Sequence, residues 1–274
     1  MEKDAFEEKC PPFLKWAGGK RWLISRHAII FPDTFNRYIE PFLGSGAVFF
    51  KLQPKKAILS DINKELISTY IAIKEDWQKV LMKLEKHHKL FNKDYYYKIR
   101  QSKSENIYDK AARLIFLNRT CWNGLYRVNL KGEFNVPIGT KTDVLREEDN
   151  FEKVSKMLKN VTLRNSDFEV IINKAKANDL LFVDPPYTVL HDNNGFIKYN
   201  EQLFSWADQI RLKNCLKRAK DRGSIIIMAN ASHSSIRHLY EADFTITELQ
   251  RHSIIAASSV KRKSCKELII TSYI

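Results

Sequence analysis

The chain has 274 residues, of which 44% are hydrophobic and 28% charged, and this balance excludes an intrinsically disordered protein. Its 46 Lys and Arg outnumber 32 Asp and Glu, and the net charge of +14 favours a polyanionic partner, either nucleic acid or an anionic membrane surface. No apolar run approaches the roughly 20 residues of a membrane-spanning helix, and the acidic start of the chain does not fit a secretory signal.

The four cysteines are far apart in the sequence and form no C-x-x-C pair. They are Cys10, Cys121, Cys215 and Cys265. This spacing favours free thiols in a reducing compartment over a disulfide framework or a zinc site. We therefore expect a cytoplasmic protein without a bound metal.

Short apolar runs alternate with helical patterns, which is typical of a mostly parallel sheet. Strands are predicted at residues 36–40, 57–60, 161–163, 180–183, 224–228, 244–249 and 268–273. Helices are predicted at 47–52 and between Tyr199 and Gly223, the second with Leu203, Ala207, Ile210 and Leu216 facing inward.

The middle of the chain has a different pattern. Between Glu75 and Thr142 helical spacing predominates, and 14 Lys and Arg accompany 7 Asp and Glu, which places half of the net charge there. We predict a Rossmann-like α/β fold with helices on both faces of the sheet and an antiparallel strand near the C-terminus. Residues 1–74 and 161–274 would form this catalytic domain, and residues 75–160 a helical target-recognition domain.

A glycine turn, Gly44-Ser45-Gly46, lies between the first predicted strand and its helix. Glycines let the backbone approach a ligand at a helix N-terminus, and Asp61, at the end of the next strand, could accept hydrogen bonds from ribose hydroxyls. The pair indicates an adenosine-containing ligand, NAD or S-adenosylmethionine (AdoMet), although a tight turn without a ligand is an alternative. Phe49 occupies the place of the third dinucleotide-binding glycine, which favours AdoMet.

The most specific motif is Asp184-Pro185-Pro186-Tyr187, which follows an apolar strand. The prolines end the strand at the edge of the sheet where α/β proteins bind ligands. There the Asp carboxylate and a proline carbonyl could accept both N–H groups of an exocyclic amine and make its lone pair available for methylation. The Tyr ring could stack on an extruded base. The alternative is an N-capping Asp before a proline-led helix.

This motif is accompanied by further blocks in the same order as in one family. They are Phe13–Lys20, Glu40–Gly46, Ser60–Asn63, Asn118-Arg119, Trp122–Arg127 and Gly132–Pro137. From about Phe13 to the C-terminus the sequence resembles the Dam-type DNA adenine-N6 methyltransferases of the D12 class. The resemblance implies AdoMet as methyl donor, a flipped adenine in double-stranded DNA as target, and a site that is GATC or contains GAT.

The resemblance also assigns residues to the cofactor and to the reaction. The cofactor residues are Trp16, Lys20, Phe42, Gly44, Gly46, Asp61, Ile62, Asp167, Phe168 and Asp184. The catalytic residues are Asp184, Pro185, Pro186 and Tyr187. In this assignment Asp61 binds the ribose and Ile62 packs on the adenine ring, whereas Trp16 and Phe168 could instead belong to the core.

A third set is assigned to DNA. It comprises Lys15, Arg119, Trp122, Asn123, Leu125, Arg127, Pro137, Lys141, Lys261 and Arg262. Arg127 could make paired hydrogen bonds to a guanine edge, or else contact a phosphate or form a surface ion pair. Lys141 stands where many family members carry an aromatic residue, which leaves the outer base pair open. Lys261 and Arg262 could bind phosphate or lie on a solvated turn.

The expected partner is double-stranded DNA, with neither a membrane nor a metal involved. We expect a monomer in solution, and a cognate restriction endonuclease as partner if the enzyme serves a restriction system. Two other functions stay open. One is methylation of cytosine N4 or RNA by the same fold, which Asp184 and the recognition blocks disfavour. The other is a DNA-binding regulator without activity.

Overall fold

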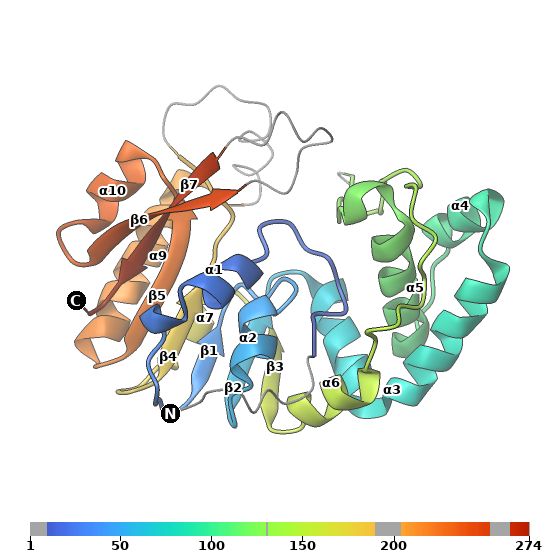
Figure 1. Ribbon diagram of the computed structural model, residues 1–274, viewed down its shortest axis with the longest axis horizontal. Helices are drawn as coiled ribbons and strands as arrows, with labels where there is room; N and C mark the ends of the chain where they lie inside the picture. The colour runs from blue at the N-terminus through green and yellow to red at the C-terminus, as the bar shows by residue number, and fades with distance from the viewer. Residues whose placement is uncertain (1–9, 130, 190–203, 253–263, 274) are drawn as a thin grey trace. The chain divides into compact units, whose positions relative to one another are not determined.

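A computed structural model describes residues 10–129, 131–189, 204–252 and 264–273 (Figure 1). The chain forms two compact units and passes between them several times. The first unit comprises Met1–Arg21, Gly44–Lys55 and Asn63–Asn165. The second comprises Trp22–Leu43, Lys56–Ile62 and Ser166–Ile274. No helix in the described ranges is both long enough and apolar enough to cross a membrane.

Within the described residues the sheet has seven strands, and six of them belong to the second unit in the order β2-β1-β4-β5-β7-β6. Their bounds are β1 Tyr38–Glu40, β2 Ala57–Asp61, β4 Leu180–Val183, β5 Ile225–Ala231, β6 Thr245–His252 and β7 Ser264–Thr271. Strands β2, β1, β4 and β5 are parallel neighbours, whereas β7 runs antiparallel to both β5 and β6. The predicted mostly parallel sheet with an antiparallel strand near the C-terminus is confirmed.

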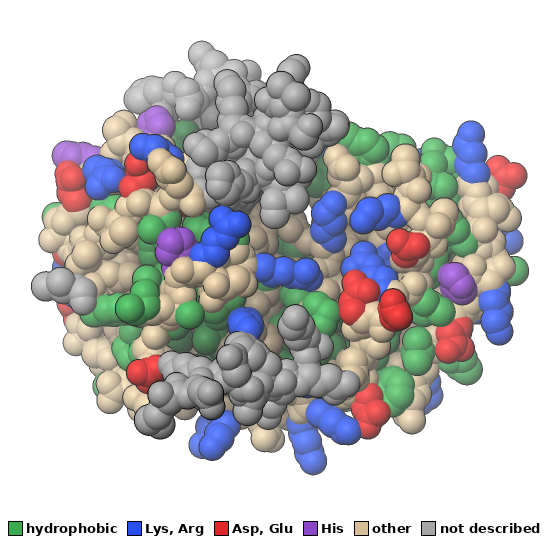
Figure 2. Space-filling model, in the orientation of Figure 1, with side chains coloured by type: hydrophobic (Ala, Val, Ile, Leu, Met, Phe, Trp, Pro, Cys, Tyr) green, Lys and Arg blue, Asp and Glu red, His purple; other side chains and the backbone are tan. Residues whose placement is uncertain are grey.

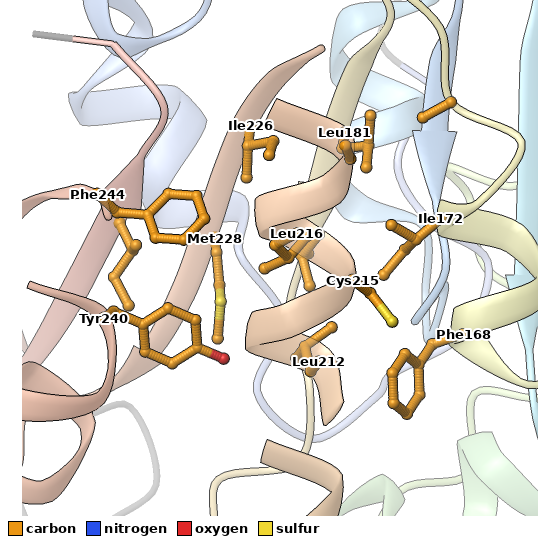
Figure 3. Packing of buried hydrophobic residues seen from close by; sticks show 14 of the residues in the cluster. Phe168, Ile172, Leu181, Leu212, Cys215, Leu216, Ile226, Met228, Tyr240 and Phe244 are labelled. Carbon is orange, nitrogen blue, oxygen red and sulfur yellow. The ribbon is translucent and has the colours of Figure 1, made fainter. Parts of the chain in front are cut away.

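Alternate residues of these strands face two different layers. Leu181 and Val183 of β4 join a buried cluster with three helices (Figure 3). These helices are α7 Phe168–Ile172, α9 Trp206–Asp221 and α10 Ser234–Tyr240. On the opposite face, the ring of Phe182 lies 6.1 Å from that of Phe31, which follows α1 Arg21–Arg26 and η1 Ala28–Ile30. Helices therefore cover both faces of the sheet, as predicted.

The buried face of helix α9 differs from the predicted one. It begins at Trp206, where Ser205 and Asp208 form a capping box, and its buried residues are Gln209, Leu212, Cys215, Leu216 and Ala219. The predicted inward face was right at Leu216, which is buried, but wrong at Ile210, which is 42% exposed, and at Ala207, which is also exposed; Leu203 lies outside the described residues. The buried face includes a polar residue, Gln209, which a hydrophobic pattern does not predict to be buried. Its side chain is accommodated there because it accepts a hydrogen bond from Asn230 at 3.3 Å.

The first unit is mainly helical. Its elements are α2 Ala47–Leu52, α3 Lys64–Leu90, α4 Lys93–Gln101, α5 Ile107–Thr120, η2 Trp122–Gly124, α6 Phe151–Leu158 and β3 Val161–Asn165. Asn side chains cap the N-termini of four helices and accept a backbone N–H in each; they are Asn63, Asn92, Asn106 and Asn150. Helix α3 is interrupted at Asp76, whose carboxylate caps the second half of the helix by accepting the N–H of Lys79.

His87 of α3 makes the stability of the first unit depend on pH. Its ring stacks on Phe116 with centroids 5.0 Å apart and hydrogen-bonds Tyr95, and burial lowers its pKa to about 4. The neutral ring therefore stabilises the fold above pH 6.5, and this stability is lost as the pH falls toward 4. Between pH 7 and pH 4 the free energy of unfolding of the wild type should fall by about 2 kcal/mol more than that of His87→Gln, as measured by urea unfolding. The exposed His88→Gln serves as control, and equal pH profiles for both variants would contradict the assignment.

Candidate functional site

The strand-end motif lies at the carboxyl edge of the second unit, where the parallel strands end. Strand β4 is buried throughout, its last residue Val183 pairs with Met228 of β5, and Asp184 follows directly. Asp184 and Tyr187 are half-buried, so part of each side chain is accessible to a ligand. The two prolines that follow Asp184 end the strand because they offer no N–H to a neighbouring strand.

Three acids meet at this edge. Glu40 ends β1, Asp61 ends β2, and Asp184 follows β4. Glu40 is buried, and the hydroxyl of Tyr38 donates to its Oε2 at 2.9 Å. Burial raises the pKa of Glu40 well above its usual value, against the effect of the Tyr38 bond, and the nearby Asp184 and Asp61 raise it further. The three acids therefore disfavour one another's charge at this edge, and the effect on the Glu40 pKa is upward.

Asp167 is held by Arg211 and by the start of α7. Arg211 donates to Oδ1 at 2.8 Å and to Oδ2 at 2.9 Å, and Oδ1 also accepts the N–H of Glu169. Although partial burial acts to raise the pKa of Asp167, the hydrogen bonds from Arg211 and Glu169 lower it. A carboxylate has about four acceptor positions, and Arg211 and the Glu169 N–H use three of those of Asp167.

An aromatic cluster lies beside Asp167. Phe168 stacks on Phe42 with centroids 5.5 Å apart, and the ring of Phe204 contacts both. The Arg211 guanidinium lies 4.2 Å from the centre of the Phe168 ring. Phe168 is only 5% exposed and belongs to the core cluster (Figure 3), whereas Phe42 is half-buried. Of the two, Phe42 offers the more accessible surface to a ligand.

In the first unit, the glycine turn is packed against an aromatic pair. Gly44 has a φ of +49°, and a Cβ at this position would lie 2.8 Å from Cδ1 of Trp16. The indole of Trp16 stacks on Tyr126 with centroids 5.1 Å apart, and the Tyr126 hydroxyl donates to Glu65 at 2.9 Å. Any residue other than glycine would be both strained and crowded here, so the turn keeps its backbone close to the indole.

The blocks around Trp16 and Trp122 are joined by a buried amide. Asn118 accepts the backbone N–H of Lys15 at 2.9 Å and donates to the Lys15 carbonyl at 2.8 Å. The same side chain donates to the carbonyl of Gly124 at 3.2 Å, where a φ of +64° requires glycine. These bonds place two sequence blocks that are about a hundred residues apart next to each other.

Arg119 is placed differently from the expectation that it contacts DNA. It is 2% exposed, and its two terminal nitrogens donate to the Asp149 carboxylate at 2.5 and 2.6 Å. They also donate to the carbonyls of Val144 and Phe13. Reaching a phosphate or base would break these bonds, so Arg119 is corrected to an internal residue that supports the segment around it.

The other residues assigned to DNA in the first unit are more accessible. Trp122 is 54% exposed, and Lys15, Asn123, Arg127, Pro137 and Lys141 are exposed, whereas Leu125 is half-buried. The Nε of Arg127 donates to Asn135 at 2.8 Å, which orients the guanidinium and leaves its terminal nitrogens for another partner. Partial burial lowers the pKa of Lys15, and the positive charge of Lys141 lowers it further. Basic side chains therefore lie close together in this segment.

Of the remaining assigned residues, Lys20 is buried and donates to the Gly18 carbonyl at 2.7 Å, and Ile62 is 75% exposed. Gly46 has a φ of +63° and precedes α2. Pro185 is buried and Pro186 is half-buried. Lys261 and Arg262 lie outside the described residues.

Lys and Arg side chains are spread over the face drawn in Figure 2, with Asp and Glu between them. Among the described residues no cluster of His, Cys, Asp or Glu could hold a metal ion.

Sequence reasoning did not identify Glu40 and Arg211 as site residues. The sequence contains a signal for Glu40. Tyr38 and Glu40 are two residues apart on a strand, so their side chains face the same side of the sheet and can form a hydrogen bond. Arg211 lies on α9, 44 residues after Asp167. No local pattern relates these two residues, so only the fold brings them together.

Comparison with known proteins gives consistent similarities. The sequence model of a family described as D12 class N6 adenine-specific DNA methyltransferase matches residues 16–255. The chain is 35% identical to the Type II methyltransferase M1.LlaDCHI of Lactococcus lactis subsp. cremoris, over 96% of this chain and 95% of that protein. It is 37% identical to M.MjaIII, a Type II methyltransferase of Methanocaldococcus jannaschii, over 96% and 99%. It is 32% identical to the DNA adenine methylase of Haemophilus influenzae, over 94% and 92%.

Proposed function

Because this chain belongs to the D12 class N6 adenine-specific DNA methyltransferases, we propose that it transfers a methyl group from AdoMet to N6 of an adenine extruded from double-stranded DNA. The observation that carries this proposal is the strand-end motif. Asp184 leaves a buried strand at the carboxyl edge, partly accessible, and Tyr187 lies partly accessible three residues further on.

In the reaction the two acceptors of the motif hold the target amine. The Asp184 carboxylate accepts one N–H of the adenine amine and the Pro185 carbonyl accepts the other, which directs the nitrogen lone pair out of the ring plane. When bound, AdoMet supplies a methyl group on a sulfonium, a good leaving group for direct displacement. In a single displacement the amine nitrogen would take the methyl group and the sulfur would leave as a neutral thioether, and the proton lost by the amine would pass to the Asp184 carboxylate and from there to solvent. Tyr187 holds the base by stacking.

Both units contain residues that suit AdoMet. In the second unit, Asp61 ends β2 and suits the ribose hydroxyls, and Ile62 offers an exposed apolar side chain to the adenine. Asp167 keeps an acceptor position for the adenine amine. In the first unit, a backbone turn at Gly44 that no Cβ could occupy suits a closely packed ligand. Trp16, Lys20 and Gly46 complete the set assigned to this ligand.

For target recognition we infer that Arg127 reads a guanine. The bond from its Nε to Asn135 fixes the plane of the guanidinium, and the two terminal nitrogens match the O6 and N7 acceptors of a guanine edge. Exposed Trp122 suits the gap left by the extruded base, and Asn123, Leu125 and Pro137 suit contacts around it. Lys15 and Lys141 suit phosphates. The proposed target is GATC or another GAT-containing site, and the Type II relatives favour a role beside a restriction endonuclease.

The reaction is tested by transfer of a labelled methyl group from AdoMet to double-stranded DNA and to RNA, followed by analysis of the modified base. We expect N6-methyladenine in DNA. N4-methylcytosine, or labelling of RNA alone, would replace the proposed substrate. Binding of DNA without any transfer would instead favour a regulator without activity.

The specificity is tested with Arg127→Ala. Loss of a paired contact to guanine should relax discrimination at one G·C pair by about 1–3 kcal/mol, because the wrong base no longer loses these bonds. Lys131→Ala, which removes an exposed cation from the same segment, should affect all sites alike. Methylated adenines are mapped by sequencing the same genomic DNA after treatment with each protein.

Two results would contradict the specificity proposal. Wild-type methylation outside GAT-containing sites would exclude the proposed target. Uniformly weaker methylation by Arg127→Ala, with its site preference unchanged, would show that Arg127 contacts a phosphate.

A further inference from the structure

A buried acid on the last strand contacts the tyrosine of the strand-end motif. The hydroxyl of Tyr187 donates to Oε2 of Glu267 at 3.1 Å. Glu267 is 4% exposed, whereas Tyr187 is half-buried. The two residues are 80 positions apart in the sequence, and both belong to the second unit. The contact therefore joins the base-binding motif to the sheet.

The antiparallel direction of β7 explains how this acid reaches the carboxyl edge. Glu267 lies near the start of β7 and pairs with Ala231, the last residue of β5, and with Leu249 of β6. A parallel strand would present its final residues at this edge, whereas β7 presents its early ones. The reversed strand thus brings the Glu267 side chain to the edge of the sheet beyond which Tyr187 follows the end of β4.

The position of Glu267 is central and constrained. Its strand is bonded on both sides, and the next residue, Leu268, is buried in the core cluster on the opposite face of the sheet. A carboxylate removed from water requires hydrogen-bond donors, and the Tyr187 hydroxyl is one of them. Because the strand fixes the acid, the hydrogen bond anchors the hydroxyl end of the Tyr187 side chain and so limits the positions that the ring can take.

We propose that Glu267 is a positioning residue that holds the Tyr187 ring in the orientation needed to stack on the extruded adenine. The inference rests on the proposed function of Tyr187. Holding the ring before the base arrives removes the need to order it during binding, so the target amine meets Asp184 in the reactive geometry more often. The effect should appear in the rate of methyl transfer rather than in the affinity for AdoMet or DNA.

The test measures single-turnover methyl transfer at saturating AdoMet and DNA, with KM values measured separately. Glu267→Ala and Tyr187→Phe should each lower the rate about tenfold, with both KM values within about twofold of wild type. Glu267→Gln should restore most of the rate, because its amide oxygen accepts the same hydrogen bond. The double variant should be no slower than either single variant, since both remove one interaction.

Glu248→Ala is the matched control. Glu248 is an acid of the neighbouring strand β6, but it is exposed and pairs with Lys266 at 2.6 Å, so its loss should leave the rate unchanged. Thermal melting of each variant separates a loss of folding from a loss of positioning. Should Glu267→Ala fold poorly, Tyr187→Phe still tests the hydrogen bond, because it removes only the hydroxyl.

Two results would overturn the inference while leaving the proposed function intact. One is a wild-type rate for Tyr187→Phe, which would show that the hydrogen bond does not matter. The other is an additive loss in the double variant, which would show that the two residues act separately. Absence of methyl transfer by the wild type would instead refute the proposed function itself.

Discussion

Replacing Asp184 by Ala should reduce methyl transfer to DNA by on the order of 10³-fold, because the target amine loses the acceptor that holds it in the reactive geometry. The rate is measured in a single turnover with labelled AdoMet. DNA affinity, measured by mobility shift, should stay near wild type, since in the proposed mechanism this carboxylate contacts the extruded base rather than the duplex.

Asp184→Asn provides the matched comparison for this result. Its amide oxygen can still accept one N–H of the target amine. Its NH2 group, however, can only donate hydrogen bonds, and the negative charge of the carboxylate is lost. We expect a rate between those of the wild type and Asp184→Ala. Transfer by Asp184→Ala within tenfold of wild type would contradict the assigned role of this residue.

Replacing Arg119 by Ala should lower the free energy of unfolding by about 3–5 kcal/mol, because it leaves the Asp149 carboxylate partly buried without its partner. The carbonyls of Phe13 and Val144 also lose their donors. Urea unfolding measures the change. Since Phe13 begins the block that contains Lys15 and Trp16, DNA affinity should fall as well.

The control for this prediction is an exposed ion pair in the same unit. Lys156 lies 2.6 Å from Glu152 on the surface of α6, and Lys156→Ala should change the stability by less than about 1 kcal/mol. Arg119→Lys should also be destabilising, because an ammonium cannot make the paired contact to Asp149. A fully stable Arg119→Ala would show that the buried pair does not support this unit.

Local elements were predictable where a short apolar run ends at a clear signal. Residues 180–183 form β4 as predicted, because four apolar residues end at Asp and two prolines, and residues 47–52 form α2 after the glycine turn. The start of α3 was missed. This helix begins at Lys64, before the predicted helical region, and is broken at Asp76, where a side chain competes with the backbone for hydrogen bonds.

The sequence by itself determined the family, the order of the strands and the identity of the motif residues, because strand ends and turns follow from residues close together in the chain. Only the tertiary structure decided the environment of the ionisable groups. It buries Arg119 against Asp149, raises the pKa of Glu40 by burial and by the nearby Asp184, and brings Glu267 to Tyr187. Burial and ion pairing depend on segments that are distant in sequence. From the sequence alone Arg119 was therefore assigned to DNA, because its partner Asp149, 30 residues away, is identified only by the fold.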